Sequence, residues 1–345
     1  MKLDNAGISE LLARAAEQAE GHRQRAYLKA SREAMAWPVE ASDVLGAGLP
    51  LTKLTGIGPH LALRLEEWIS DPPADLCPPE IRSGFLTMAQ ALGTVREHPD
   101  WRQELRGDLQ MHTTYSDGVL SVLDMAREAS DYGGYAFVAI TDHSGGQRIP
   151  SGMDAEAIAA QRREIDAANE QLELTGIRIL RGIEMNLTPQ GEGDTDPDIL
   201  REMDIVLGSF HSQLRGTHDQ TDRYLAALSN PDIQVLAHPR GRMYDRRAGL
   251  HADWPKVFEF AASRGKALEI DANPNRQDLQ IGLLELAREA GVTISIGTDA
   301  HSAYELQFMS YGLAAAIRAG IPRERILNFR TANQVREWVE SVRER

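Results

Sequence analysis

The stretch that decides the fold is residues 107–118, which read GDLQMHTTYSDG. It begins as an alternating strand, places His112 at the strand's end, and turns through Ser116, Asp117 and Gly118 into a helix. A polar cluster where a strand meets a helix is where α/β proteins place their chemistry, because the scaffold holds the loop rigidly. Ser-Asp-Gly is also an ordinary turn, so this stretch is informative only because the same pattern recurs at later strand ends.

Strand and helix patterns alternate from residue 107 onward. Amphipathic helices are expected between most of the strands, for example over 155–174 and 282–290. Seven β/α repeats rich in β-branched residues predict a parallel sheet. A closed barrel is the simplest arrangement, and an open doubly wound sheet is the alternative. The expected strands cover residues 107–112, 136–141, 177–184, 205–210, 234–237, 267–271 and 293–297.

Ionisable residues recur at the ends of these strands, and a barrel would collect them at one mouth. Packing so many such groups together without a counter-ion would be costly. Imidazole mixed with carboxylate oxygens suits Zn, Mn or Fe, and the number of groups exceeds what one ion can use. The sequence therefore predicts a multinuclear metal site, built from His112, Asp117, His143, Glu184, His211, His238, Asp299 and His301.

Length and composition indicate a globular protein with one large and one small domain. The chain has 345 residues, 42% of them hydrophobic, and a single cysteine, Cys77, which excludes an internal disulfide. No signal peptide or membrane-spanning apolar run is seen, so a cytoplasmic protein without membrane contact is expected. The net charge of −14 argues against a broad basic surface for nucleic acid. Bound divalent cations would reverse the sign locally.

Residues 1–100 read as a separate helical domain, because proline-containing breaks at 70–73, 77–79 and 97–100 interrupt the helices, and the domain boundary is expected near 95–105. Within it, two apolar-striped helices are expected around the turn Gly56-Ile57-Gly58, after Lys53. Glycines there would leave N–H groups uncovered at a helix start, where a phosphate oxygen can bind. This pattern resembles a helix-hairpin-helix, which binds the DNA backbone. A plain helical hairpin is the alternative.

The ordered motifs H-T-x-x-S-D-G, T-D-H, G-I-E, S-x-H-S, H-P and T-D-A-H closely resemble the PHP (polymerase and histidinol phosphatase) superfamily over residues 105–345. The resemblance implies a distorted seven-stranded (β/α) barrel, preceded here by the small all-α domain. It also implies up to three divalent metal ions, which could be Mn, Zn or Fe.

The resemblance assigns ligands to each ion. One ion would be bound by His112, Glu184 and Asp299. A second ion would share Glu184 and be bound by His211 and His238. The third ion would be bound by Asp117, His143 and His301. Asp108 and Asp142 would lie behind the ligands, Asp142 orienting a neighbouring His. The family's first motif is His-x-His, but its first His is Gln110 here. An amide oxygen is a weaker ligand than imidazole, so we expect a weakened first ion site.

A narrower resemblance is to bacterial family X DNA polymerases, which carry a C-terminal PHP domain. It rests on residues 238–242, 273–279 and 308–312, and on the helical domain. No room remains for a polymerase body, so no polymerase activity is expected. Some relatives have lyase activity through a Schiff-base lysine in the second hairpin helix. That position holds Arg64, whose guanidinium stays protonated, so no lyase activity is expected.

The expected function is hydrolysis of phosphate esters on DNA, at 3′ ends or damaged ends. The nucleophile would be a hydroxide made available by the first two ions. Asp299 or a nearby His, such as His143, would transfer a proton. Arg240 and Arg242 would hold the phosphate, or form salt bridges at the barrel rim. The alternatives are a small-molecule phosphatase of the histidinol-phosphate type and a non-catalytic DNA-binding adaptor.

Overall fold

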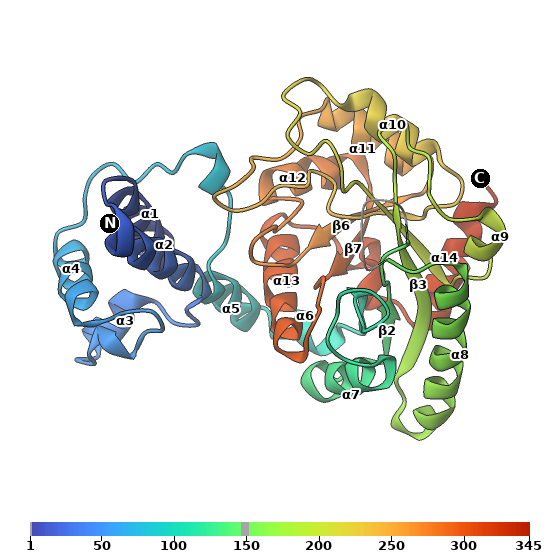
Figure 1. Cartoon of the computed structure of the whole chain (residues 1–345), viewed down its shortest axis with the longest axis horizontal. Coiled ribbons are helices and arrows are strands. Elements are labelled where there is room, and N and C mark those ends of the chain that lie inside the picture. Colours follow the sequence, from blue (N-terminus) through green and yellow to red (C-terminus); the bar gives the residue numbers. More distant parts are fainter. Residues whose placement is uncertain (1, 146–151) are drawn as a thin grey trace. The chain divides into compact units, whose positions relative to one another are not determined.

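A computed structural model describes residues 2–145 and 152–345 of the chain. The chain divides into two compact units, Met1–Glu97 and His98–Arg345 (Figure 1). The first unit is helical, and the second contains every strand of the described residues. No helix in these two described ranges is long and apolar enough to cross a membrane.

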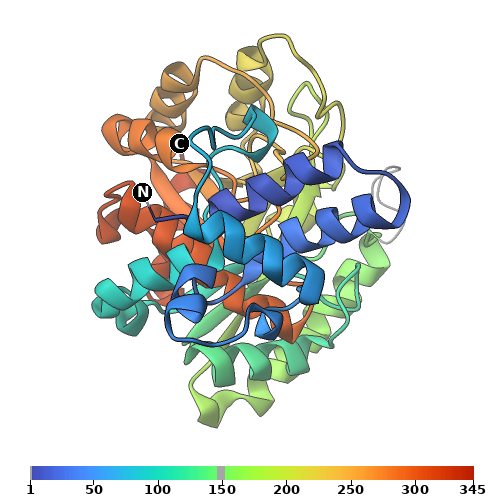
Figure 2. The same cartoon turned by 90° about the vertical axis from the view of Figure 1, so that its left-hand side faces the viewer.

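The first unit is built on its first two helices, α1 (Asn5–Glu17) and α2 (Gly21–Ala36), which lie side by side in both views (Figures 1 and 2). The carboxylate of Asp4 caps the first of them by accepting from the Gly7 amide at 2.9 Å, which satisfies one of the free amides of the first turn. The other helices of this unit are α3 (Ala41–Gly46), α4 (Pro59–Ser70) and α5 (Met88–Glu97), with 3₁₀ turns η1 (Leu51–Lys53) and η2 (Glu80–Arg82).

The first unit has its own hydrophobic core, which includes Ile8, Leu12, Trp37 and Leu65. Buried polar contacts join its helices as well. Ser9 on α1 donates to the carbonyl oxygen of residue 31 on α2 at 2.8 Å. A buried polar group is retained at little cost when it is hydrogen-bonded in this way. The unit is therefore held by apolar burial and by internal polar contacts.

The turn at Gly56 differs from the expected pair of flanking helices. The helix after it, α4, begins at Pro59 as expected, with Gly58 as its N-cap. Before it stands only the three-residue 3₁₀ turn η1, which Pro50 precedes. Pro50 cannot donate a backbone hydrogen bond, and α3 has already ended at Gly46. The expectation of a full first helix was therefore wrong.

Seven parallel strands form one sheet in the second unit, in the order β1 to β7 without interruption. This confirms the predicted barrel-type α/β fold rather than a doubly wound sheet, whose strand order would reverse. The strands are β1 (Gly107–Met111), β2 (Phe137–Ile140), β3 (Arg178–Asn186), β4 (Ile205–Ser209), β5 (Val235–Leu236), β6 (Ala267–Asp271) and β7 (Thr293–Gly297).

Helices surround the strands (Figure 1). Side-chain caps start several of them: Ser121 caps α7 and Asp154 caps α8 by accepting from a first-turn amide. The described helices of this unit are α6 (Pro99–Glu104), α7 (Val122–Gly133), α8 (Ala155–Gln171), α9 (Pro197–Leu200), α10 (Thr221–Ser229), α11 (Trp254–Ser263), α12 (Ile281–Ala290), α13 (Met309–Arg318) and α14 (Ala332–Arg343). Short 3₁₀ turns are η3 (Glu173–Thr175), η4 (Ala303–Phe308), η5 (Arg323–Arg325) and η6 (Leu327–Phe329).

The sheet closes between β7 and β1, where a side chain replaces part of the ladder. The Asn328 amide accepts from the Ile296 amide of β7 at 2.8 Å and donates to the Gly107 carbonyl of β1 at 2.9 Å. Nearer the carboxyl ends, His112 donates from its backbone to the Ala300 carbonyl at 2.9 Å. Asn328 is fully buried, so its amide joins the two edges away from water.

The barrel is apolar at the end where α14 packs and polar at the end where the carboxyl ends of the strands lie. Leu109, Leu180 and Leu207 belong to a core cluster that also contains Val335 and Val339 of α14. This helix therefore packs its apolar side against the core at one end of the barrel. The carboxyl ends of the strands lie at the other end, which leaves that end for polar side chains.

Candidate metal centre

The strand ends bring the predicted ligands together, and Glu184 of β3 stands at the centre. Its side chain is fully buried. One carboxylate oxygen, Oε1, lies 2.7 Å from Nε2 of His238 and 3.2 Å from Nε2 of His211. These two imidazoles follow β5 and β4, respectively. One oxygen of Glu184 therefore faces two histidines that follow the next two strands of the sheet, β4 and β5.

The second oxygen of Glu184 faces the opposite set of residues. Oε2 lies 3.2 Å from Nδ1 of His143 and 3.4 Å from Nε2 of His112. The amide nitrogen of Gln110 donates to the same oxygen at 3.2 Å. Burial alone would raise the pKa of Glu184, but the facing imidazoles hold that pKa well below its ordinary value. The carboxylate is therefore charged and divides the site into two halves.

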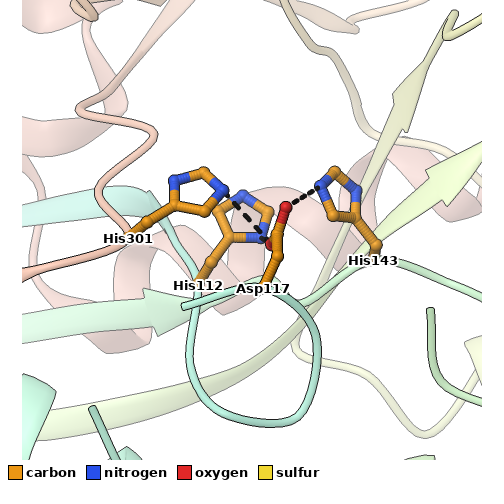
Figure 3. Close-up of side chains that lie close together, drawn as sticks. All are labelled: His112, Asp117, His143 and His301. Carbon is orange, nitrogen blue, oxygen red and sulfur yellow. Dashed lines mark ion pairs between the residues drawn. The ribbon is translucent and has the colours of Figure 1, made fainter. Parts of the chain in front are cut away.

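A second cluster forms around Asp117, in the turn after β1 (Figure 3). Its carboxylate lies 3.2 Å from Nε2 of His301, 3.7 Å from Nδ1 of His112 and 3.7 Å from Nε2 of His143. Burial would raise the pKa of Asp117, but the His301 hydrogen bond and the surrounding imidazoles lower it below its ordinary value. Asp117 is the most exposed of these four residues, at 41% of its side chain. It therefore forms the open side of this cluster.

Asp299, which follows β7, forms a third cluster together with His112 and Glu184. Its Oδ1 lies 3.1 Å from Nε2 of His112, and its Oδ2 lies 3.6 Å from Nε of Arg276. Asp299 has a positive φ of 54°, a conformation that non-glycine residues rarely adopt and that occurs at functional sites. Burial would raise the pKa of Asp299, but Arg276 and His112 lower it.

Two histidines are oriented by hydrogen bonds from the far side of the ring. Nδ1 of His211 contacts Oδ1 of Asn186 at 2.6 Å, and Nδ1 of His301 contacts the Asp299 carbonyl at 2.7 Å. In both rings Nε2 is thereby directed at a carboxylate, Glu184 or Asp117. Metal-binding histidines are typically held by such contacts, which fix the tautomer and the ring orientation.

The donor set fits divalent metal ions. Three groups place their ligand atoms within 4.8 Å of one another: His112, Asp117, His143 and His301; His143, Glu184 and His211; and His112, Glu184 and Asp299. Buried ring nitrogens of these clusters, including both of His112, make no hydrogen bond of normal geometry. Buried nitrogens without such partners are costly unless a cation completes them.

The structure brings the residues of the first expected group together, adds His112 to the third, and differs in the second. There His143 joins Glu184 and His211, whereas His238 was expected. His238 nevertheless contacts Glu184 at 2.7 Å, so it stands at the edge of the same half of the site. Its φ of 28° is positive, which shows that the backbone is bent where this side chain enters the site.

Gln110 lies beside these groups, as its position in the first motif predicts. Its amide nitrogen bonds Glu184, and its carbonyl oxygen is buried without a hydrogen bond. A Cβ added at Gly297 would lie 3.0 Å from that oxygen and 2.4 Å from Oε1 of Glu269. The backbone of β7 therefore needs glycine here to leave room for both side chains.

Asp108 and Asp142 lie behind the ligands. Each of the two carboxylates accepts a hydrogen bond from a backbone amide of a neighbouring segment. Asp108 accepts from the Thr298 hydroxyl at 2.6 Å and from the Thr298 amide at 3.1 Å, which joins β1 to the segment after β7. Burial raises the pKa of Asp108 to about 7. Asp142 accepts from Thr113 and Gln161, each at 2.6 Å, and from the Ser116 hydroxyl.

The expectation that Asp142 orients a histidine is not met. Its side-chain hydrogen bonds in the described residues run to the loop after β1 and to α8. This loop carries Asp117, so Asp142 positions a ligand by fixing the loop instead. Four donors occupy its two oxygens, which leaves little capacity for an imidazole.

The two arginines expected to hold phosphate are buried in the scaffold. Arg240 and Arg242 expose 6% and 2% of their surface, and both donate to the side-chain oxygen of Gln280. Arg240 also donates to the Leu250 carbonyl at 3.2 Å. Arg276, by contrast, contacts a ligand carboxylate directly. A role of Arg240 or Arg242 toward phosphate stays a prediction.

In the first unit, the residues expected to bind DNA take different positions. Lys53, Gly56 and Gly58 are exposed, whereas Ile57 is buried in the core of that unit. The Arg64 guanidinium lies over the Trp68 ring, 4.9 Å from its centroid. Contact of these residues with DNA stays a prediction.

Sequence reasoning missed Asn186 and Arg276 as parts of the site. Asn186 had a usable signal, since it follows Glu184 by two positions in one strand and therefore points to the same face. Arg276 lies in the loop between β6 and α12, and no periodicity indicates where such a loop turns. Only the folded chain brings it to Asp299.

Comparison with known proteins gives two kinds of relative. The chain is 40% identical over 268 residues to the DNA polymerase/3′-5′ exonuclease PolX of Bacillus subtilis, a match that covers 77% of this chain and 46% of that protein. It thus spans about half the length of that relative. It is 26% identical over 258 residues to a probable phosphatase of Caldanaerobacter subterraneus, covering 71% of this chain and 95% of that protein.

Other comparisons are more distant. The chain is 28% identical over 231 residues to the probable phosphatase YcdX of Escherichia coli, covering 64% of this chain and 89% of that protein. A solved histidinol phosphate phosphatase from Lactococcus lactis, complexed with zinc, L-histidinol and phosphate, aligns with a TM-score of 0.48 and 16% identity over 63% of this chain and 95% of that one. No protein-family model matches the chain.

Proposed function

Because this chain belongs to the PHP superfamily, we propose that it is a metal-dependent phosphoesterase that hydrolyses DNA at 3′ ends or damaged ends. The observation that carries the proposal is the arrangement around Glu184, whose two oxygens each face two histidines. A carboxylate placed in this way can be shared between two cations. Such paired sites are suited to displacement at phosphorus.

The proposed ligands are the residues of the three groups, together with His238 and Gln110. The identity of the ions, Mn, Zn or Fe, is left to measurement. When bound, divalent ions would supply Lewis acidity, which makes hydroxide available at neutral pH and offsets the charge of the phosphate. The chain's own task is to hold the ligands in place before substrate arrives.

Several residues perform that positioning. Asn186 and the Asp299 carbonyl fix the rings of His211 and His301. Asp142 holds the loop that carries Asp117. Arg276 remains protonated, because the carboxylates around it raise its pKa further despite burial. Its guanidinium is therefore a permanent positive charge beside Asp299, where it can orient that carboxylate and stabilise negative charge on the phosphate. Asp299 or His143 would accept or return a proton.

DNA is favoured as the substrate by the 40% identity to a relative named as a DNA polymerase and 3′-5′ exonuclease. The helical unit supports the same choice, since the exposed Lys53 stands before the Gly56–Gly58 turn. A small-molecule phosphatase is the second candidate. The observation that favours it is that relatives named as probable phosphatases align along 89–95% of their own length.

The experiment that tests the proposal is hydrolysis by the purified protein with Mn²⁺ or Zn²⁺. Substrates are end-labelled duplexes with a 3′-hydroxyl, a 3′-phosphate or an abasic site, tested beside histidinol phosphate. Cleavage of DNA that disappears in Asp299→Ala is the expected result. Turnover of only the small phosphate would assign the second candidate and refute DNA hydrolysis.

Two variants refine the result. Removal of residues 1–97 is expected to weaken DNA hydrolysis while leaving hydrolysis of a small phosphate ester, since the barrel has its own core. Gln110→His addresses the non-catalytic adaptor. If the native chain binds DNA without turnover under every metal condition and Gln110→His restores turnover, the native protein is an adaptor rather than an enzyme.

A further inference from the structure

A cavity lies at the amino ends of the strands, opposite the metal centre. Its volume is about 400 Å³, which lies within the range of small-molecule sites. Three arginines line it: Arg106 before β1, Arg178 at the start of β3, and Arg336 on α14. The metal ligands lie at the carboxyl ends of the same strands. The cavity is therefore separate from the proposed active site.

Strand register brings two of the arginines together. The Ala136 amide donates to the Arg106 carbonyl at 2.7 Å, and the Arg178 amide donates to the Ala136 carbonyl at 2.9 Å. Arg106 and Arg178 thus flank Ala136, whose methyl group leaves space between two long side chains. Both arginines are exposed, so a solute can reach them.

In the part of the chain that the structure describes, a carboxylate pairs with only one of the three guanidinium groups of this cavity, that of Arg336. Among the described residues, no carboxylate forms a salt bridge with Arg106 or Arg178, and no acidic residue lines the cavity. Arg336 uses Nε to contact Oδ1 of Asp204 at 2.9 Å, which leaves its terminal nitrogens available. Unneutralised guanidiniums sharing one cavity repel one another. In a chain of net charge −14, such a cluster points to an anionic ligand.

Besides the arginines, the cavity is lined by apolar side chains and by the first residues of α14. The buried Leu180 side chain, Ala136 and Ala332 contribute the apolar surface. Thr331 caps α14 by accepting from the Gln334 amide, and the cap leaves the first amides of this 12-residue helix to other acceptors. This helix end supplements the arginines as a place for a phosphate oxygen.

We propose that this cavity binds a small phosphate-bearing anion of nucleotide size, held by Arg106, Arg178 and Arg336. Guanidinium groups match phosphate with two parallel hydrogen bonds, and the apolar surface suits a base or sugar. The ligand would join α14 to the start of β1 and β3. Since Val335 and Val339 of α14 pack in the barrel core, binding would stabilise the closed barrel.

The test is calorimetric titration of the full-length, metal-loaded protein with inorganic phosphate and with the non-hydrolysable methylene phosphonate analogue of adenosine monophosphate. The double variant Arg106→Gln/Arg178→Gln is expected to weaken binding of the nucleotide analogue roughly tenfold or more, as for the loss of charge-assisted hydrogen bonds. Arg127→Gln, an exposed arginine on α7, is the matched control and should leave the affinity unchanged.

Binding at the metal centre is separated by Asp117→Asn. The proposal requires that this variant retain the arginine-dependent binding event. It is overturned if the double variant, shown to be folded by its melting curve, binds both probes as the native protein does. It is equally overturned if Asp117→Asn abolishes all binding, or if the double variant changes only the affinity for duplex DNA. If phosphate binds through the arginines but the analogue does not, the nucleotide-size assignment is wrong.

Discussion

Oε1 of Glu184 lies 2.7 Å from Nε2 of His238, and this contact joins the ends of β3 and β5 across β4. The other oxygen of the same carboxylate faces His112 and His143. A single side chain thus contacts imidazoles on both sides of the site. No other described carboxylate forms ion pairs with four histidines, so Glu184 is the residue whose change should affect the metal centre most.

Glu184→Gln should remove metal and activity together. The amide has one acceptor oxygen in place of two and carries no charge, so at least one half of the site loses a ligand. We expect metal affinity and hydrolysis each to fall by roughly a hundredfold or more, as read by bound-metal analysis and steady-state kinetics. Glu285→Gln, on the exposed face of α12, is the control. Retention of full metal content in Glu184→Gln would contradict the central role assigned to Glu184.

Gly297→Ala should distort the site through a single methyl group. The added Cβ would lie 2.4 Å from Oε1 of Glu269 and 2.6 Å from Cβ of Gln110. Overpacking of this kind costs about 1–3 kcal/mol, and we expect a lower melting temperature together with weaker metal binding.

The matched control for this substitution is Gly282→Ala on α12. There an added Cβ meets nothing within 4 Å, and alanine is favoured over glycine in a helix by roughly 0.5–1 kcal/mol. Its melting temperature should therefore stay the same or rise. Equal effects of the two substitutions would show that the space at Gly297 is not critical.

Arg276 and Arg242 should respond differently to replacement by glutamine. Arg276→Gln removes the positive charge beside Asp299, so kcat should fall roughly tenfold to a hundredfold with only a small change in melting temperature. Arg242→Gln removes a buried contact with Gln280, so its main effect should be a lower melting temperature. A raised KM for Arg242→Gln without loss of stability would instead support a phosphate-holding role for Arg242.

Lys266 should make stability depend on pH in the alkaline range. Its ammonium group is buried and donates to the Ile233 carbonyl at 2.8 Å, and burial lowers its pKa to about 8. Above that pH the folded chain has released this proton, whereas the unfolded chain holds it up to about pH 10.4. The unfolded state then binds more protons, so this residue's contribution to the unfolding free energy rises with pH.

The measurement is chemical denaturation between pH 7 and pH 10, compared with Lys266→Met. The stability of the native protein relative to the variant should increase by up to about 1.4 kcal/mol per pH unit across the window from 8 to 10. The other titrating groups act equally on both proteins and cancel in the comparison. A difference that stays constant with pH would contradict a lowered pKa for Lys266.

Sequence reasoning identified side chains that the fold brings together, because it depends on strand ends. Alternation locates the end of a short strand to within a residue or two, and in a parallel barrel all such ends meet. His112, Glu184 and Asp299 follow directly from this rule. The strand limits were also close, although β5 is reduced to Val235–Leu236.

Contacts made by residues in loops could not be predicted from the sequence in the same way. The side-chain direction of Arg242 depends on where Gln280 falls in a distant loop, and local pattern does not fix that path. The helix before Gly56 was also overestimated, because apolar spacing does not show that Pro50 confines the segment to a 3₁₀ turn. Apolar periodicity thus gave the order of elements but not the paths of loops.

The role of Asn328 in closing the sheet has a consequence during synthesis on the ribosome. β7 is the last strand and Asn328 follows it, so β1 stays without its β7 neighbour, and without the Asn328 bridge, until most of the chain has emerged. The helical unit can form its core much earlier, because that core uses residues 3–76. The nascent protein therefore exposes an open sheet edge for most of its translation, and chaperone binding or misassembly should concentrate in that interval.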